Sequence, residues 1–145
     1  INNMWLLFSP QDIIDIHDNV LNPGELIGQA GDKSLPGMLG RIDSRLQYSQ
    51  IQDIFDLAAA YALAIAQGHV FNDANKRTAF AAMDLCLCNH GIQINWDVSA
   101  VGDMIILVAQ GHVDETELAA WLRQRTSTAN EVRDETESDT EAERD

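Results

Sequence analysis

The stretch HVFNDANKRTAF, residues 69–80, joins two segments with the character of helices and decides how the chain is built. The run Ala58–Gly68 before it is rich in Ala, Leu and Ile and ends at glycine, a residue that is common just past a helix C-terminus. The segment Asn75–His90 after it is predicted to be a second helix, with Asn75 as its N-terminal cap. The pattern predicts two central helices joined by a polar loop.

Two cations, Lys76 and Arg77, fall in the first turn of the second predicted helix. A helix start carries unpaired N–H groups and roughly half a positive charge, so a purely structural helix favours Asp or Glu there. A bound polyphosphate would reverse this penalty, because Arg77 can hold two phosphate oxygens and Lys76 can act as a point charge. The pattern therefore predicts a helix start that binds phosphate.

Two further side chains of the stretch suit chemistry on a phosphate. Asp73, just before the predicted cap, could hold the Mg²⁺ that usually accompanies a polyphosphate. His69, at the end of the first helix, carries an imidazole, which can take up a proton near neutral pH and could accept one from a hydroxyl. Phe71 between them is expected to plug into the core and fix the course of the loop.

The string HVFNDANKRT, residues 69–78, resembles the motif of the Fic/Doc proteins, H-x-F-x-[D/E]-G-N-[G/K]-R. Ala74 departs from it, since most members carry Gly at this position. Lys76 makes the chain resemble the Doc branch, the death-on-curing toxins of toxin–antitoxin modules. A looser similarity extends from Ser9 to about Arg125. The resemblance implies a compact, mostly α-helical Fic-type domain.

The resemblance also implies that part of a nucleotide is transferred to a protein hydroxyl, with His69 as general base, Asp73 on Mg²⁺, and Asn75 and Arg77 on phosphates. Fic enzymes with Gly at the position of Lys76 transfer AMP. In Doc a side chain there is implied to reverse the bound nucleotide, so that the gamma-phosphate of ATP passes to a threonine of elongation factor Tu and translation stops. Such a transfer needs mainly positioning and charge stabilisation.

Other interpretations of these residues stay open. AMP transfer of the Fic type is one, although Lys76 argues against it, and a catalytically idle protein that binds a nucleotide or an antitoxin is another. A metal-hydrolase cluster of His17, Asp18, His69 and Asp73 is a weaker alternative, because adjacent helical residues diverge by about 100 degrees. For His17 we expect instead a place on the polar side of a surface helix.

Composition limits the class of protein. The chain has 145 residues, 46% of them hydrophobic, which suits one domain with a real core. Its net charge of -14 and the lack of a basic face argue against nucleic-acid binding. No apolar run approaches the roughly 20 residues of a membrane span, which predicts a cytoplasmic protein, and the resemblance to Doc implies a bacterial one. Cys86 and Cys88 are expected to be buried thiols.

The chain is predicted to divide into a helical domain, residues 1–125, and an acidic disordered tail, residues 126–145, with eight acidic and two basic side chains. At most one small β pairing is expected, between Met4–Phe8 and Ile92–Trp96. Helices are predicted from Ser9-Pro10, over Met38–Tyr48 and Asp53–Gln67, over Asn75–His90, from Asp97 or Ser99 to Gly111, and from Asp114.

The segment Asn22–Gly37 contains Gly and Pro throughout and is predicted to be a long loop. In the Fic family this region includes a flap that aligns the target by strand addition; Glu25–Leu35 is the candidate by position, and a plain surface loop is the alternative. Arg41 and Arg45 beyond it could reach phosphate or an acidic partner, although such pairs are commonly solvated. The resemblance to Doc also implies inhibition by a small Phd-like antitoxin.

Overall fold

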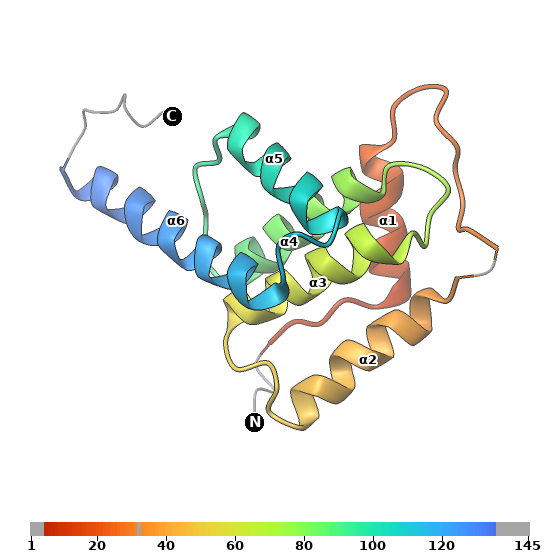
Figure 1. Cartoon of the computed structure of the whole chain (residues 1–145), viewed down its shortest axis with the longest axis horizontal. Coiled ribbons are helices and arrows are strands. Elements are labelled where there is room, and N and C mark those ends of the chain that lie inside the picture. Colours follow the sequence, from red (N-terminus) through yellow and green to blue (C-terminus); the bar gives the residue numbers. More distant parts are fainter. Residues whose placement is uncertain (1–4, 32, 136–145) are drawn as a thin grey trace.

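The computed structural model describes residues 5–31 and 33–135, and the regular structure of this part of the chain is helical (Figure 1). The fold is therefore mostly α, as predicted. None of the described helices is both long enough and apolar enough to cross a membrane. The helices in chain order are α1 (Pro10–Val20), α2 (Leu35–Gln47), α3 (Ile54–Gly68), α4 (Asn75–Asn89), α5 (Val98–Ala109) and α6 (Glu115–Glu135).

Helices α3 and α4 form the centre of the molecule and pack most extensively on each other. In Figure 1 they lie between α1 and α2 on one side and α5 and α6 on the other. The run Leu57–Ala62 of α3 is buried on all sides, which confirms the prediction from its apolar composition. Most residues of this run are alanines, and their small side chains allow the neighbouring helices to approach α3 closely. The central pair fixes the two ends of the loop between α3 and α4.

Most helices begin at a side chain that accepts a backbone N–H of the first turn. Ser9 starts α1 in a reciprocal capping box with Asp12, and Asp97 accepts from Ala100 N at 3.1 Å to start α5. Asp114 and Glu117 bond each other's backbone N–H at the start of α6. Such caps are worth about 1 kcal/mol each. They explain why these helix starts could be read from the sequence.

Helix α2 begins at Leu35, earlier than the predicted Met38, because Ser34 accepts the N–H of Gly37 at 3.0 Å and caps the helix. Its second residue is Pro36, which is favoured in a first turn because no N–H is needed there. The long loop before it therefore ends at Ser34. The loop was predicted to continue to Gly37.

The predicted β pairing is absent from the described residues, and Met4 lies outside them. The segment Ile92–Trp96 packs on the core without becoming a strand. Its Trp96 ring contacts Phe80 edge-on at 5.3 Å, and Trp96 Nε1 donates to Asp84 Oδ1 at 2.9 Å. The segment is thus held by side chains of α4. The alternation of apolar residues predicted a strand here, but the segment pairs with no strand among the described residues.

Helix α6 continues to Glu135, past the boundary predicted after Arg125. A helix that is already formed gains one hydrogen bond for each added residue, which favours extension even through Ser and Thr. Residues 136–145 of the predicted tail lie outside the described residues. A separate acidic tail therefore stays a prediction.

The two cysteines differ, contrary to the expectation that both are buried. Cys86 is fully buried, and burial raises the pKa of its thiol to about 12. Cys88 is exposed, because residues two apart on a helix point in different directions. His90, just past α4, joins Cys86 O at 2.8 Å and Leu6 N at 2.9 Å through its two ring nitrogens. It ties the N-terminal segment to the end of α4.

Candidate functional site

The loop between α3 and α4 begins and ends at residues in the left-handed conformation. His69 has φ 51° and ψ 44°, and Ala74 has φ 64° and ψ 27°. A residue with a Cβ pays roughly 1–2 kcal/mol for this conformation, whereas glycine adopts it freely. This explains why a glycine would be easier to accommodate than Ala74. The two reversals turn the chain sharply enough to leave α3 and enter α4 within a short loop.

Asn75 is the first residue of α4, whereas the sequence predicted it to be the cap; the residue at the cap position is Ala74. The left-handed conformation of Ala74 moves the helix start by one residue. The Asn75 side chain instead reaches back to Phe71, accepting its N–H at 3.1 Å and donating to its carbonyl at 2.9 Å. Asn75 therefore holds the loop closed.

The loop is anchored from below by His17 of α1, which is fully buried. Its ring stacks on Phe71 at 3.9 Å and 8°. Its Nε2 lies 2.9 Å from the Asp73 carbonyl oxygen and its Nδ1 lies 3.1 Å from Asp18 Oδ1. The expected surface position of His17 is wrong, because α1 turns this face towards the loop. The expected burial of Phe71 is confirmed.

The metal-hydrolase alternative receives no support from this arrangement. Among the side chains that the structure describes, no group of three or more His, Cys, Asp or Glu is arranged to hold a metal ion. His17 is engaged with the loop backbone and with Asp18, and His69 lies exposed at the other end of the loop. What remains for a metal is the single carboxylate of Asp73.

Asp73 and Arg77 are brought together by the loop that follows α1. Leu26 N donates to Asp73 Oδ2 at 3.1 Å, and both terminal nitrogens of Arg77 donate to the carboxylate of the preceding residue, Glu25. Arg77 also donates to Val20 O. The hydrogen bond to Glu25 raises the pKa of Arg77, with a smaller contribution from the nearby Asp73 charge. The two predicted ligand-binding groups therefore lie in one place.

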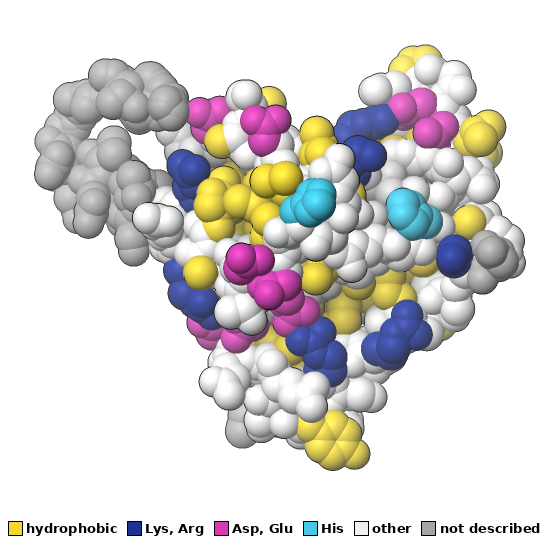
Figure 2. Space-filling model, viewed as in Figure 1, with side chains coloured by type: hydrophobic (Ala, Val, Ile, Leu, Met, Phe, Trp, Pro, Cys, Tyr) yellow, Lys and Arg dark blue, Asp and Glu magenta, His cyan; other side chains and the backbone are white. Residues whose placement is uncertain are grey.

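Lys76 and His69 are exposed at the same loop. The start of α4 has no side-chain cap and no acidic residue in its first turn. Lys76 and Arg77 are its second and third residues, so their charges add to the positive end of the helix dipole. Figure 2 shows Lys and Arg side chains next to acidic ones where the α1–α2 loop lies over the start of α4. The site is open to solvent, and it combines the cations Lys76 and Arg77 with the carboxylates of Glu25 and Asp73.

The α1–α2 loop runs antiparallel beside the loop between α3 and α4. Ala30 N donates to Val70 O at 2.7 Å, Asn72 N donates to Gly28 O at 3.2 Å, and Gln29 and Phe71 form an antiparallel bridge. The Asn72 amide also reaches carbonyls of this strand-like segment. The flap candidate Glu25–Leu35 thus begins beside the predicted site. Its role in aligning a target stays a prediction.

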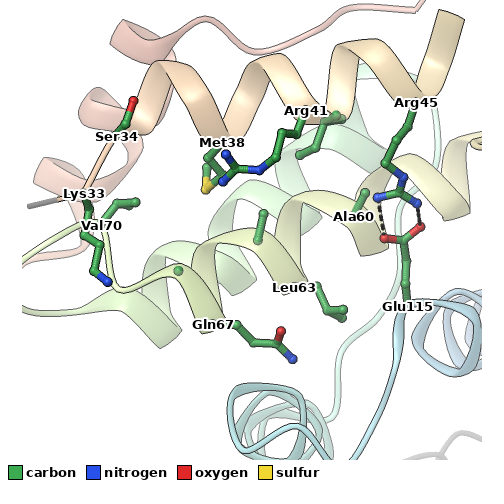
Figure 3. Close-up of a pocket in the computed structure, with 13 residues that line it drawn as sticks. Lys33, Ser34, Met38, Arg41, Arg45, Ala60, Leu63, Gln67, Val70 and Glu115 are labelled. Atoms are coloured by element: carbon green, nitrogen blue, oxygen red, sulfur yellow. Dashed lines mark hydrogen bonds and ion pairs between the residues drawn. The ribbon is translucent and has the colours of Figure 1, made fainter.

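A cavity of about 430 Å³ opens between α2 and α3 on the side of Gly68 and Val70 (Figure 3). Figure 2 shows hydrophobic side chains at the bottom of a hollow there with cations at its edge. Arg45 is held by Glu115 of α6 through both terminal nitrogens, and this hydrogen-bonded pair raises the pKa of Arg45. Arg45 is therefore engaged within the fold. Arg41 and Lys33 also line the cavity.

Sequence reasoning missed two residues that shape the site. His17 had a local signal, since it stands four residues after buried Ile13 and so on the same helix face. Glu25 had none, because its partner Arg77 lies 52 positions away and only the path of the loop joins them. The contact of His17 with Phe71 and that of Glu25 with Arg77 each join two different elements, so neither can be inferred from spacing within one helix.

Comparison with known proteins agrees with the motif. The model of the Fic/DOC family matches residues 7–87, which span α1 to α3, the loop and nearly all of α4. The chain is 36% identical to the protein kinase doc of Escherichia phage P1 over 116 residues, which cover 79% of this chain and 91% of that protein. The motif, the helical fold and both matches lead to one conclusion: the chain belongs to the Fic/DOC family and groups with its Doc branch.

Proposed function

We propose that this protein is a protein kinase of the Doc type, which transfers the gamma-phosphate of ATP to a serine or threonine hydroxyl of another protein. The protein kinase activity in the name of its phage relative supports the reaction class. By resemblance to Doc, the target is a threonine of elongation factor Tu in the bacterial cytoplasm, and the consequence is arrest of translation.

The start of α4 is the observation that carries the proposal. Its first turn offers unpaired N–H groups without a capping side chain, and Lys76 and Arg77 add two cations where a structural helix favours acids. Asp73 stands directly before this turn, close enough to affect Arg77. Lys76, Arg77 and the N–H groups suit the oxygens of a phosphate chain, and Asp73 suits the divalent cation that it carries.

The proposed reaction uses His69 as general base. The hydroxyl oxygen of the target forms a bond to the gamma-phosphorus while the bond from that phosphorus to the bridging oxygen breaks, and ADP leaves. The hydroxyl proton passes to the imidazole of His69, which is exposed and available to a protein substrate. Lys76, Arg77 and the N–H groups of α4 stabilise the charge on the phosphate oxygens.

Asp73 is the residue that would hold Mg²⁺. Its Oδ2 accepts the N–H of Leu26, a contact that an incoming metal ion would replace. Mg²⁺ is commonly bound by one or two carboxylates together with phosphate oxygens, so a single carboxylate suits it. When bound, the ion would neutralise part of the phosphate charge.

Lys76 is proposed to decide which phosphorus is attacked. By resemblance, Gly at this position accompanies AMP transfer, and a side chain there favours the reversed nucleotide of Doc. Lys76 is exposed at the second position of α4, where its side chain can occupy space next to the helix start. This placement supports the proposal that the gamma-phosphate is the transferred group. Inhibition by a small Phd-like antitoxin is proposed on the same resemblance.

The proposal is tested by incubating the protein with Mg²⁺, purified elongation factor Tu, and ATP labelled at either the alpha or the gamma phosphate. We expect gamma label on the factor and a loss of at least about 100-fold in His69→Ala. His112→Ala is the matched control, because His112 is an exposed histidine between α5 and α6. Urea unfolding should be unchanged in both variants.

Each other outcome has a distinct meaning. Alpha label on the target would replace the kinase by an AMP transferase. No label with either nucleotide, together with measurable ATP binding, would indicate an idle binding protein. Full activity of His69→Ala would remove the imidazole from the reaction.

A further inference from the structure

Glu25 covers the part of Arg77 that a phosphate would use. Its two carboxylate oxygens accept from the two terminal nitrogens of the guanidinium, one of them at 2.9 Å, and Val20 O accepts from the first nitrogen as well. The forked contact of guanidinium with carboxylate has the same geometry as its contact with phosphate. A phosphate therefore cannot make this contact until Glu25 leaves.

The next residue covers the other predicted ligand. Leu26 N donates to Asp73 Oδ2 at 3.1 Å, so neighbouring residues of one loop occupy the cation-binding and the anion-binding group. Asp73 would hold a metal ion and Arg77 a phosphate. A ligand that brings both at once can replace both contacts, whereas a phosphate alone replaces only one.

The position of Glu25 is built into the loop by a tight turn. Glu25 N donates to Asn22 O at 3.1 Å, and Asn22 N donates to Glu25 Oε1 at 2.7 Å. Pro23 and Gly24 occupy the two central positions, and Gly24 has φ 88°, the combination typical of a type II turn. Because the turn closes on itself, it presents the carboxylate to Arg77 in a fixed direction.

The contact is also suited to being broken. The side chain of Arg77 is 43% exposed and that of Glu25 is 23% exposed, so water screens the pair. The hydrogen bond from Arg77 lowers the pKa of Glu25, with a further contribution from the Asn22 N–H, and the carboxylate is therefore charged at neutral pH. Phosphate oxygens entering beside this charge would be repelled by it.

From these contacts we infer that Glu25 is an internal competitor for the phosphate site of Arg77, and that it selects metal-bound polyphosphates over simple anions. A ligand is bound fully only when the turn at residues 22–25 withdraws. The nature of the ligand rests on the proposed function, whereas the competition rests on the geometry of Glu25, Leu26, Asp73 and Arg77.

The test is calorimetric titration of the full chain with a non-hydrolysable ATP analogue plus Mg²⁺, and separately with inorganic phosphate. Glu25→Gln keeps the shape and removes the charge, so the analogue should bind about fivefold more tightly. The preference for the analogue over phosphate should shrink in the same variant. Glu25→Asp, which keeps the charge on a shorter side chain, should lie between it and the native protein.

The matched control is Asp103→Asn, which changes the net charge equally at an exposed position of α5. It should leave both affinities unchanged. Equal or weaker binding of the analogue by Glu25→Gln would overturn the inference and make Glu25 a support for Arg77. No binding of either probe to any variant would overturn it together with the proposed function. Tighter binding without transfer of a gamma-phosphate would leave the competition standing and refute only the kinase.

Discussion

The start of α4 differs from the starts of the other described helices. Ser9, Ser34, Asp53, Asp97 and Asp114 each accept an N–H of the helix that follows. At α4 the cap residue is Ala74, whose methyl side chain cannot accept a hydrogen bond and whose backbone has the strained left-handed conformation. The first turn then adds Lys76 and Arg77 to the positive end of the helix.

The difference separates what folding requires from what ligand binding requires. A helix that served only the fold would be stabilised by about 1 kcal/mol by a cap, and acidic residues in its first turn would add to this stabilisation. Helix α4 lacks both and is held instead by burial of its face against α3. A missing cap together with two cations in the first turn, at one helix start while the other described starts have a capping side chain, is the kind of exception that marks a candidate functional end.

The largest effect is expected when α4 is given the start of an ordinary helix, which removes the difference between α4 and the other described helices. In Lys76→Glu the acid suits the dipole, so the free energy of unfolding in urea should rise by about 0.5 kcal/mol. Phosphate would meet a negative charge, and the rate of gamma-phosphate transfer should fall at least about 100-fold.

The control for this variant is Ser99→Glu, which places the same acid at the second position of α5. Transfer should be unaffected there. Equal losses of transfer in the two variants would show that the start of α4 is not special.

Removing the side chain at this position asks a narrower question. In Lys76→Gly we expect gamma label on the target to fall at least about tenfold and alpha label to appear, because the side chain proposed to favour the reversed nucleotide is gone. Ala74→Gly introduces the same residue type nearby and should keep the gamma-phosphate as the transferred group. Glycine adopts the left-handed conformation of residue 74 without strain, so the free energy of unfolding of this variant should rise by about 1 kcal/mol. An unchanged product in Lys76→Gly would contradict the steric role.

The smallest effect is expected at an ordinary helix start. Asp97→Ala removes the acceptor for Ala100 N and should lower the free energy of unfolding by about 1 kcal/mol, measured in urea. The rate of transfer per folded molecule should not change, since α5 carries none of the proposed site residues. A loss of transfer here would make capping as important for activity as the charges of α4.

The sequence predicts those features that depend on neighbouring residues. Ser9 and Asp114 were identified as helix starts with capping side chains, Asp97 was one of two alternatives, and Asp53 was placed at the beginning of its helix, because a cap and its N–H lie within three residues of each other. The apolar character of Leu57–Ala62 likewise predicted a buried helix. The motif placed Asp73, Lys76 and Arg77 around the start of α4 for the same local reason.

Features that depend on docking were not predictable in this way. Asn75 was mistaken for a cap because its neighbour Ala74 takes a conformation unusual for alanine. His17 appeared to be a surface residue because its stacking on Phe71 requires the position of α1 on the loop. The course of a long loop brings Glu25 to Arg77. Side chains of α4 hold the segment Ile92–Trp96 in place.

The pairing of α3 with α4 has a consequence for how such a protein can be silenced. The loop between them is clamped at each end by the two most deeply embedded helices, and its Phe71 and Val70 are buried. Amide hydrogens in the buried middle of α3 and α4 would exchange with solvent only through global unfolding, whereas the first N–H groups of α4 have no partner within the helix. Local melting of these two helices therefore offers no route to an inactive form that remains otherwise folded. Restraint of the protein would instead act at the loop itself, through a contact such as that between Glu25 and Arg77 or through a partner that binds from outside.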